Sequence, residues 1–315
     1  MKIVYMGTPE FAVAALEALI EAGHEIVGVV TMPDKPAGRG RQLRGSAVKE
    51  YAVGRGLRVL QPERLKDEGF LEELRGLGAD IQVVVAFRML PEVVWSMPRY
   101  GTVNIHASLL PDYRGAAPIN WAIINGERRT GVTSFLLKHD IDTGDIIFQE
   151  STEIGEDDDA GTVHDRLMEM GARLAVRTVG AIGDGSAVMR RQDDIDPGTL
   201  KKAPKIFKED MRIDWGKRSE EVVNLVRGLS PYPAAWTVMR GDGGVELSVK
   251  IFKVRRIEGV ELEHGAVKVV EGERLIVGTG DGAVEVMELQ LSGKRRMGAD
   301  AMLRGMRFEG CWRCE

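Results

Sequence analysis

Short apolar runs alternate with longer segments of helical periodicity through the first half of the chain. The segments that predict strands are 2–6, 25–31, 58–60, 81–87, 102–106, 130–138 and 145–153. Helical periodicity covers 11–21, 46–55, 65–77, 116–125 and 162–182. Strands that alternate with helices predict an α/β fold, doubly wound around a mainly parallel, Rossmann-like sheet.

The pattern changes in the second half of the chain. Residues 190–207 are rich in charge, Pro and Gly, which is typical of a linker. A helix at 219–229 is then followed by short alternating strands between Gly turns, at 235–240, 247–257, 266–270, 274–277 and 284–290. We predict a first domain over 1–189, a linker over 190–207, and a small OB-like β-barrel domain over 208–315.

The charge is divided unevenly between these two parts. Of the 315 residues, 43% are hydrophobic, and the net charge is −5. Residues 200–315 hold 21 Lys and Arg against 18 Asp and Glu, and the remainder holds 22 against 30. The net charges are therefore +3 and −8, which permits a polyanionic partner for the second part without requiring one.

The sequence favours a cytoplasmic protein. It has no apolar run of 18 residues, so no membrane span is expected, and its start does not predict a signal peptide. Cys311 and Cys314 are the only cysteines, which fits a reducing compartment. A zinc site or redox pair is not expected at these two cysteines, because no second ligand pair exists in the chain. We expect a disordered tail there instead.

Polar residues gather where the strand predicted at 102–106 ends. Asn104 and His106 are two positions apart, so their side chains leave the same face of the strand. Ligands of open parallel sheets bind beyond the carboxyl ends of the strands. An Asn amide can donate to an oxyanion, and His can exchange a proton near neutral pH. Asp142, in a Gly-containing turn, is the candidate third group; by spacing alone, an ordinary polar pair and an ordinary turn remain the alternative.

The motif N-I-H-A-S-L-L-P at 104–111, with R-G-A-A-P at 114–118 and D-T-G-D at 142–145, resembles the folate-dependent formyltransferase family. Similar matches extend along nearly the whole chain, at 6–11, 33–41, 213–215, 227–233 and 290–297. The resemblance implies that Asn104, His106 and Asp142 are catalytic. It also implies that 10-formyltetrahydrofolate is the cosubstrate and that no metal is needed.

Further site residues follow from the same resemblance. Folate contacts are implied for Ser108, Leu109, Leu110 and Pro111, and for Phe87, Met89 and Leu90. The turn that holds the last three is one residue shorter than in many relatives and lacks their Gly, so its shape is left open.

The acceptor implied by the resemblance is the amino group of methionyl initiator tRNA. We expect the chain to be a monomer. The predicted tRNA contacts are Lys35, Arg39 and Arg41 in the basic loop 35–49, and Lys294 and Arg295 in the second domain. Solvated surface charge is the alternative for both groups.

Three other functions remain as alternatives. A related enzyme could formylate a nucleotide-sugar amine, or could hydrolyse the formyl group away. A catalytically silent RNA-binding module is the third, and the intact Asn, His and Asp set argues against it. No Gly-x-Gly-x-x-Gly follows the first strand, so a nicotinamide cofactor is not expected.

Overall fold

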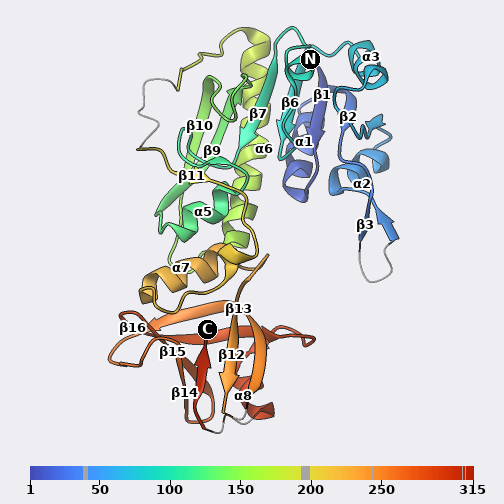
Figure 1. Cartoon of the computed structure of the whole chain (residues 1–315). Coiled ribbons are helices and arrows are strands. Elements are labelled where there is room, and N and C mark those ends of the chain that lie inside the picture. Colours follow the sequence, from blue (N-terminus) through green and yellow to red (C-terminus); the bar gives the residue numbers. More distant parts are fainter. Residues whose placement is uncertain (38–41, 193–198, 243, 307, 309) are drawn as a thin grey trace. The chain divides into compact units, whose positions relative to one another are not determined.

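The computed structural model describes residues 1–37, 42–192, 199–242, 244–306, 308 and 310–315 (Figure 1). The chain divides into two compact units, each assembled from several segments. The first unit contains 1–115, 129–152 and 164–202, and the second contains 116–128, 153–163 and 203–315.

A seven-stranded sheet forms the centre of the first unit. Its strand order is β10-β9-β7-β6-β1-β2-β5, and the strands are β1 (Lys2–Gly7), β2 (Glu25–Val30), β5 (Val59–Leu60), β6 (Ile81–Val85), β7 (Thr102–His106), β9 (Arg129–Leu136) and β10 (Ile146–Glu153). The neighbouring strands β7, β6, β1, β2 and β5 pair in parallel, whereas β7 and β9 are antiparallel. The predicted mainly parallel sheet is confirmed.

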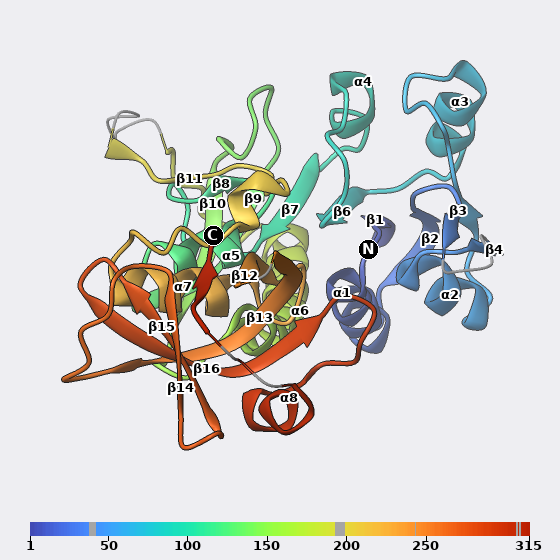
Figure 2. The same cartoon turned by 60° about the horizontal axis from the view of Figure 1, so that its bottom comes forward.

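Helices cover both faces of this sheet. They are α1 (Glu10–Glu21), α2 (Ala47–Gly54), α3 (Glu68–Gly76), α4 (Glu92–Trp95) and α6 (Ala160–Asp184). Figure 2 shows α3 and α4 on one side of β1 and β6, with α1 on the other. Polar caps fix two helix starts, because the Ser46 hydroxyl accepts from the Lys49 N–H and the Asp67 carboxylate accepts from the Phe70 N–H.

The two faces of β7 meet different surroundings. Ile105 faces α6, since a Cβ built on Gly171 would lie 3.3 Å from its Cγ2 atom. Asn104 and His106 therefore point to the opposite face. On that face, β6 contributes Val84, the register partner of Asn104, to a buried cluster with Val4, Met6 and residues of α3 and α4.

The second unit contains a closed antiparallel barrel. Its strands follow the order β13-β12-β18-β14-β15-β16, and a pairing of β13 with β16 closes it. The bounds are β12 (Ala235–Gly241), β13 (Val245–Ile257), β14 (Ala266–Val270), β15 (Arg274–Thr279), β16 (Gly282–Leu291) and β18 (Trp312–Cys314). A short β17 (Met297–Gly298) extends β16. The predicted small β-barrel is thus confirmed.

Three helices accompany the barrel: α5 (Pro118–Ile124), α7 (Ser219–Leu229) and α8 (Ala299–Gly305). Gly228 lets α5 and α7 approach, because a Cβ there would lie 2.6 Å from a side-chain carbon of Ile124. The remaining elements are β3 (Lys35–Ala37), β4 (Gln42–Arg44), β8 (Arg114–Gly115), β11 (Lys202–Ala203) and the 3₁₀ turn η2 (Glu209–Met211).

The expectation of a disordered C-terminal tail is wrong. β18 pairs with both β12 and β14, and Trp312 and Cys314 are buried in the barrel core. Burial raises the pKa of the Cys314 thiol to about 12, so it stays protonated and unreactive at neutral pH. This segment is too short and has too few apolar side chains to predict a strand from its sequence. It becomes a strand because β12 and β14 pair with it on both sides.

Candidate active site

The side chains of Asn104 and His106 leave the same face of β7 at its carboxyl end. His106 is 8% exposed, and its Nε2 atom lies 2.9 Å from the Tyr113 carbonyl oxygen. A carbonyl can only accept, so Nε2 carries a hydrogen and donates it. Among the described residues, the Asn104 carboxamide has no hydrogen-bond partner, which leaves its N–H groups available to a ligand.

Asp142 lies in the loop between β9 and β10, beside His106. One carboxylate oxygen, Oδ2, accepts a hydrogen bond of 2.9 Å from the Gly115 N–H and lies 4.0 Å from Nδ1 of His106. That second distance exceeds hydrogen-bond range, so the carboxylate and the imidazole are close but share no direct hydrogen bond. The carbonyl of Tyr113, and not the carboxylate, fixes the orientation of the ring.

Hydrogen bonds on Thr133 shape the turn at 108–111. The Thr133 hydroxyl donates to the Ser108 carbonyl over 2.6 Å and accepts from the Leu110 N–H and from Gln149. Ser108 is fully buried, and its own hydroxyl donates to the Asp112 carbonyl. The side chain of Ser108 is thus used within the turn, and any contact it makes with a ligand goes through the backbone. Leu109 and Pro111 are half-buried beside it.

The turn after β6 is held by an arginine. Arg88 donates from both terminal nitrogens to the carbonyls of Glu63 and Pro62, and its guanidinium lies 5.6 Å from the centre of the Phe87 ring. Ala86 has a φ of 47°, so an alanine occupies the left-handed conformation that a glycine would adopt more easily. Met89 is 70% exposed, whereas Leu90 belongs to the core.

Backbone strain is concentrated around these loops. In the part of the first unit that the structure describes, the non-glycine residues with positive φ are Ala86, Tyr113 and Asp142. Each such conformation costs about 1–3 kcal/mol and persists only where its surroundings enforce it. Such residues cluster at functional sites. Of the three, only Asp142 is a residue type that tolerates this conformation well.

The sequence reasoning missed Tyr113 and Gly115, which hold His106 and Asp142 through main-chain atoms. Both residues are within or beside the R-G-A-A-P motif, so position was the only available signal. Almost any residue type can supply a main-chain carbonyl or N–H, so the sequence does not identify which residues make these contacts.

The basic segment 35–49 contains structure of its own. β3 and β4 pair as an antiparallel hairpin, with Lys35 opposite Arg44. Arg39 and Arg41 lie outside the described residues. At the base of the hairpin, Asp34 accepts hydrogen bonds from Lys49 and Gln61, and both bonds hold the pKa of its carboxyl below the usual value. The charge of Lys49 is therefore balanced by a carboxylate, whereas the side chain of Lys35 is exposed to solvent.

The barrel carries a second group of predicted contacts. Lys294 and Arg295 are exposed, and neither forms an ion pair within the described part of the chain. The neighbouring Arg296 instead pairs with Glu288 and packs on the Phe252 ring.

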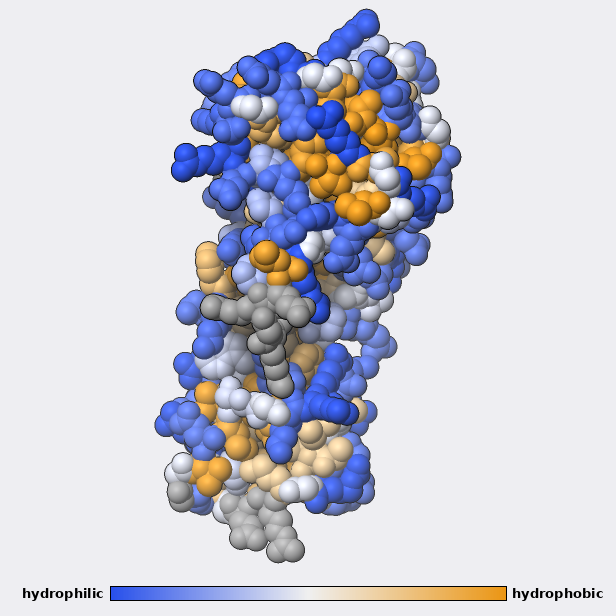
Figure 3. All heavy atoms as spheres, turned by 90° about the vertical axis from the view of Figure 1, so that its right-hand side faces the viewer, coloured by the Kyte–Doolittle hydropathy of each residue, from blue (hydrophilic) through white to orange (hydrophobic). Residues whose placement is uncertain are grey.

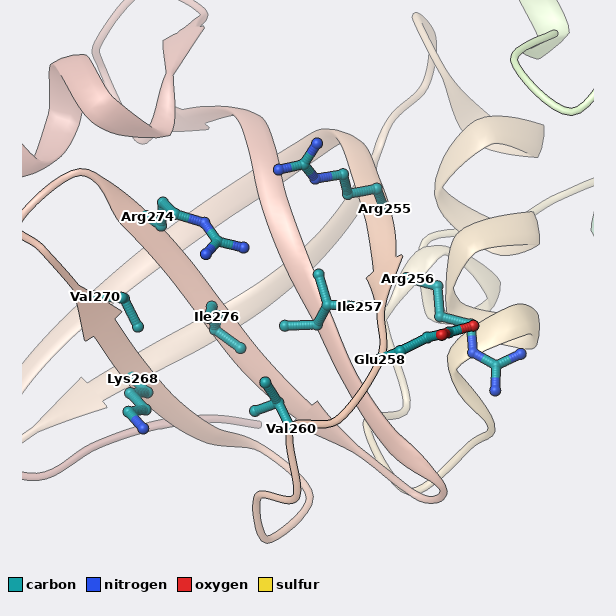
Figure 4. Close-up of a pocket in the computed structure, with 9 residues that line it drawn as sticks. All are labelled: Arg255, Arg256, Ile257, Glu258, Val260, Lys268, Val270, Arg274 and Ile276. Atoms are coloured by element: carbon teal, nitrogen blue, oxygen red, sulfur yellow. The ribbon is translucent and has the colours of Figure 1, made fainter.

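A basic pocket opens on another part of the barrel (Figure 4). It is lined by residues of β13, β14 and β15 and of the loop after β13, among them Arg255, Arg256, Lys268 and Arg274. The buried Glu285 carboxylate accepts from Arg255 over 2.9 Å and from Arg274 over 2.7 Å. Two of the four cations are thus already paired with an anion, and the pocket is less positive than its residue types suggest.

One face of the first unit bears apolar surface. Figure 3 shows it in the upper part of the view, where apolar residues (orange) gather among hydrophilic ones (blue).

Within the described residues there is no cluster of three or more His, Cys, Asp or Glu that could hold a metal ion. No helix in that part of the chain has the length and apolar character that a membrane span requires.

Comparison with known proteins gives matches along both units. The formyl transferase family model matches residues 1–179, and the model of the formyl transferase C-terminal domain matches 205–307. A methionyl-tRNA formyltransferase of Bacteroides fragilis is 53% identical over 308 residues, which cover 97% of this chain and 95% of that protein. One of Parabacteroides distasonis is 54% identical over 314 residues, covering 98% and 96%.

Solved structures share the fold at low identity. HypX from Aquifex aeolicus, in complex with tetrahydrofolic acid, matches 96% of this chain and 47% of its own with a TM-score of 0.65 and 19% identity. The N-formyltransferase from Helicobacter canadensis, in complex with folinic acid and dTDP-3-aminofucose, gives a TM-score of 0.64 at 20% identity, covering 94% and 100%. The family model covers more than half of the chain and the relatives match almost all of it, so the chain belongs to the formyl transferase family.

Proposed function

We propose that this chain transfers the formyl group of 10-formyltetrahydrofolate to the α-amino group of methionyl initiator tRNA. The observation that carries the proposal is the 53–54% identity to methionyl-tRNA formyltransferases, which extends over both units. The solved sugar N-formyltransferases match at about 20% identity, so their acceptor carries no comparable weight.

The reaction forms one bond and breaks another at the formyl carbon. The neutral amine attacks that carbon, and the carbonyl oxygen becomes negative in the tetrahedral intermediate. Collapse breaks the bond to N10 of the folate, which receives a proton in place of the one that the amine loses.

Asn104 and His106 stabilise the negative oxygen. The Asn104 carboxamide donates with N–H groups that no described protein group uses. In His106, Nε2 is committed to the Tyr113 carbonyl, so Nδ1 is the nitrogen that carries a proton toward the reacting centre. Because the ring is held at one end and nearly buried, it loses little orientation freedom when the intermediate forms.

Asp142 receives the proton that leaves the attacking amine, directly or through water. Its Oδ2 atom is anchored on the Gly115 N–H, and within the described residues Oδ1 has no such partner. The same carboxylate lies 4.0 Å from Nδ1 of His106, so the proposed proton acceptor and the proposed oxyanion donor are neighbours.

The folate is held by the turns at 86–91 and 108–111, which supply apolar side chains and main-chain groups. Phe87, Met89 and Leu109 offer apolar contacts, and an aromatic ligand ring suits such a surface. The acceptor tRNA is contacted by Lys35, Arg39 and Arg41 of the basic segment 35–49 and by Lys294 and Arg295 from the barrel. We infer that the protein acts in the cytoplasm, because its tRNA substrate takes part in protein synthesis there.

A transfer assay tests this function. Purified chain, 10-formyltetrahydrofolate and methionyl initiator tRNA should yield formylmethionyl-tRNA and tetrahydrofolate in equal amounts. A nucleotide-linked amino sugar serves as the competing acceptor, and free formate release is measured in the same mixture. Formylation of the sugar alone, or formate release without formylated tRNA, would contradict the proposal.

A further inference from the structure

We propose that Gln192 is a positioning residue that holds Asp142 in its reactive place. The proposal rests on the formyl transfer proposed above. Gln192 lies in the stretch predicted as a linker, yet its side chain is only 4% exposed.

The Gln192 carboxamide bridges two loops of the first unit. Its Nε2 donates to the carbonyl of Asp142 over 3.1 Å and to that of Gly144 over 2.6 Å. Its Oε1 accepts from Arg114 over 2.7 Å. Both donor hydrogens and one acceptor oxygen are thus used, a combination that a carboxylate or an apolar side chain cannot reproduce.

The loops that it joins meet again at the Asp142 carboxylate. Gly115, next to Arg114, donates its N–H to Oδ2 of Asp142. Gln192 therefore links the segment of Arg114 and Gly115 to the turn of Asp142 and Gly144 by hydrogen bonds. If this bridge is lost, the distance from Asp142 to both Gly115 and His106 is no longer fixed.

The Asp142 turn needs such support. Asp142 has a φ of 53°, and Gly144 is pressed so closely against Leu136 that an added Cβ would lie 1.6 Å from its carbonyl oxygen. On the other side of Asp142, the loop is exposed, and Ile141 is 56% accessible. The strained turn is thus fixed at its base and has little packing at its tip.

Gln192 is itself anchored by the main chain. Two residues earlier, Arg190 exchanges both backbone hydrogen bonds with Ile146 of β10, each 2.8 Å long. This bridge fixes the path of the chain as it leaves α6, so the side chain at 192 arrives at the loop in one register.

The test replaces Gln192 in the full-length chain and measures formyl transfer. Gln192→Met keeps the length of the side chain without its polar atoms, and Gln192→Glu keeps the acceptor for Arg114 without the donors. Val188→Ala, at a 73% exposed position four residues before Gln192, is the control. We expect kcat to fall ~10-fold or more in both Gln192 variants, because a misplacement of about 1 Å can cost ~10²-fold. The KM for folate should stay within about twofold of wild type, and the control should match wild type.

A double-mutant cycle separates positioning from general stability. In an Asp142→Ala background, measured by single turnover, Gln192→Met should change the rate less than about twofold, because nothing remains to be positioned. The inference would be overturned if Gln192→Met lowered the rate by the same factor with and without Asp142. It would also be overturned if the Gln192→Met protein kept more than half of the wild-type kcat. Either result would leave the proposed function standing. A wild-type chain that formylates no tRNA would overturn the proposed function, and this inference with it.

Discussion

At the scale of single residues, the proposed mechanism depends on two groups from one strand. In that mechanism Asn104 and His106 each donate to the developing oxyanion, so Asn104→Ala and His106→Ala should each lower kcat by ~10²–10³. The fold should persist in both variants, because the apolar side chains of Val103 and Ile105, which pack β7 into the core, stay in place. Steady-state kinetics with methionyl-tRNA, beside circular dichroism of each variant, checks the prediction.

The control for the His106 variant is His139→Ala. The side chain of His139 is 86% exposed, so its loss should leave the rate unchanged. A folded His106→Ala protein that keeps more than a tenth of the wild-type kcat would show that the imidazole has no role in the transfer.

At the scale of elements, the β3–β4 hairpin is expected to place the acceptor end of the tRNA. Replacing both Arg39 and Arg41 with Ala should lower the single-turnover rate at saturating tRNA, because a misplaced amine loses its orientation. Folate binding should not change, since the ion pair of Asp34 and Lys49 at the base of the hairpin stays intact. Single-turnover formylation and a folate titration measure the two effects. An unchanged rate would return the hairpin to the role of a solvated surface segment.

Three strands of the barrel are joined by the Glu285 carboxylate. Glu285 on β16 accepts from Arg274 on β15 and Arg255 on β13, and these arginines hold the pKa of its carboxyl below the usual value. Glu285→Gln should lower the free energy of unfolding by about 1–2 kcal/mol at pH 7, the range of a charge-assisted hydrogen bond with half-exposed partners. Glu288→Gln, which breaks the exposed pair with Arg296, should change it by less.

The pH dependence of this effect has a definite sign. The folded-state pKa of Glu285 is lowered, so its contribution is complete above the unfolded value of about 4.3 and is lost as pH falls through the folded value. Thermal unfolding of wild type and Glu285→Gln should therefore differ at pH 7 and converge well below pH 4. A difference that persists or grows at low pH would mean that the ion pairs do not stabilise the barrel.

At the scale of the whole molecule, tRNA binding should be distributed over both units and should weaken with salt. Lys294→Ala with Arg295→Ala should weaken binding at low salt and reduce the slope of log K against log salt by about 2, if each side chain meets one phosphate. The KM for folate should not change. Arg304→Ala is the matched control, because Arg304 already pairs with Asp300. Equal salt slopes for wild type and the double variant would remove the barrel cations from the interface.

Local patterns determined much of the architecture. The parallel strands, the long helix α6 and the barrel strands other than β18 were predictable, because alternation and helical periodicity reflect which face of each element is buried. Asn104 and His106 could be paired by spacing alone, since side chains two apart on a strand must share a face. Asp142 needed the family resemblance, because a turn of this composition is common in any fold.

What the sequence could not determine was which main-chain groups would meet. The Tyr113 carbonyl, the Gly115 N–H and the contacts of Gln192 depend on where three loops lie after the sheet has formed, and residue type carries no record of that. β18 was missed for the same reason, because three residues become a strand only between two neighbours that offer unpaired edges. The sequence by itself thus determined the elements and two of the candidate catalytic groups. Only the tertiary structure decided what holds those groups in place, because these hydrogen bonds join residues far apart in the chain.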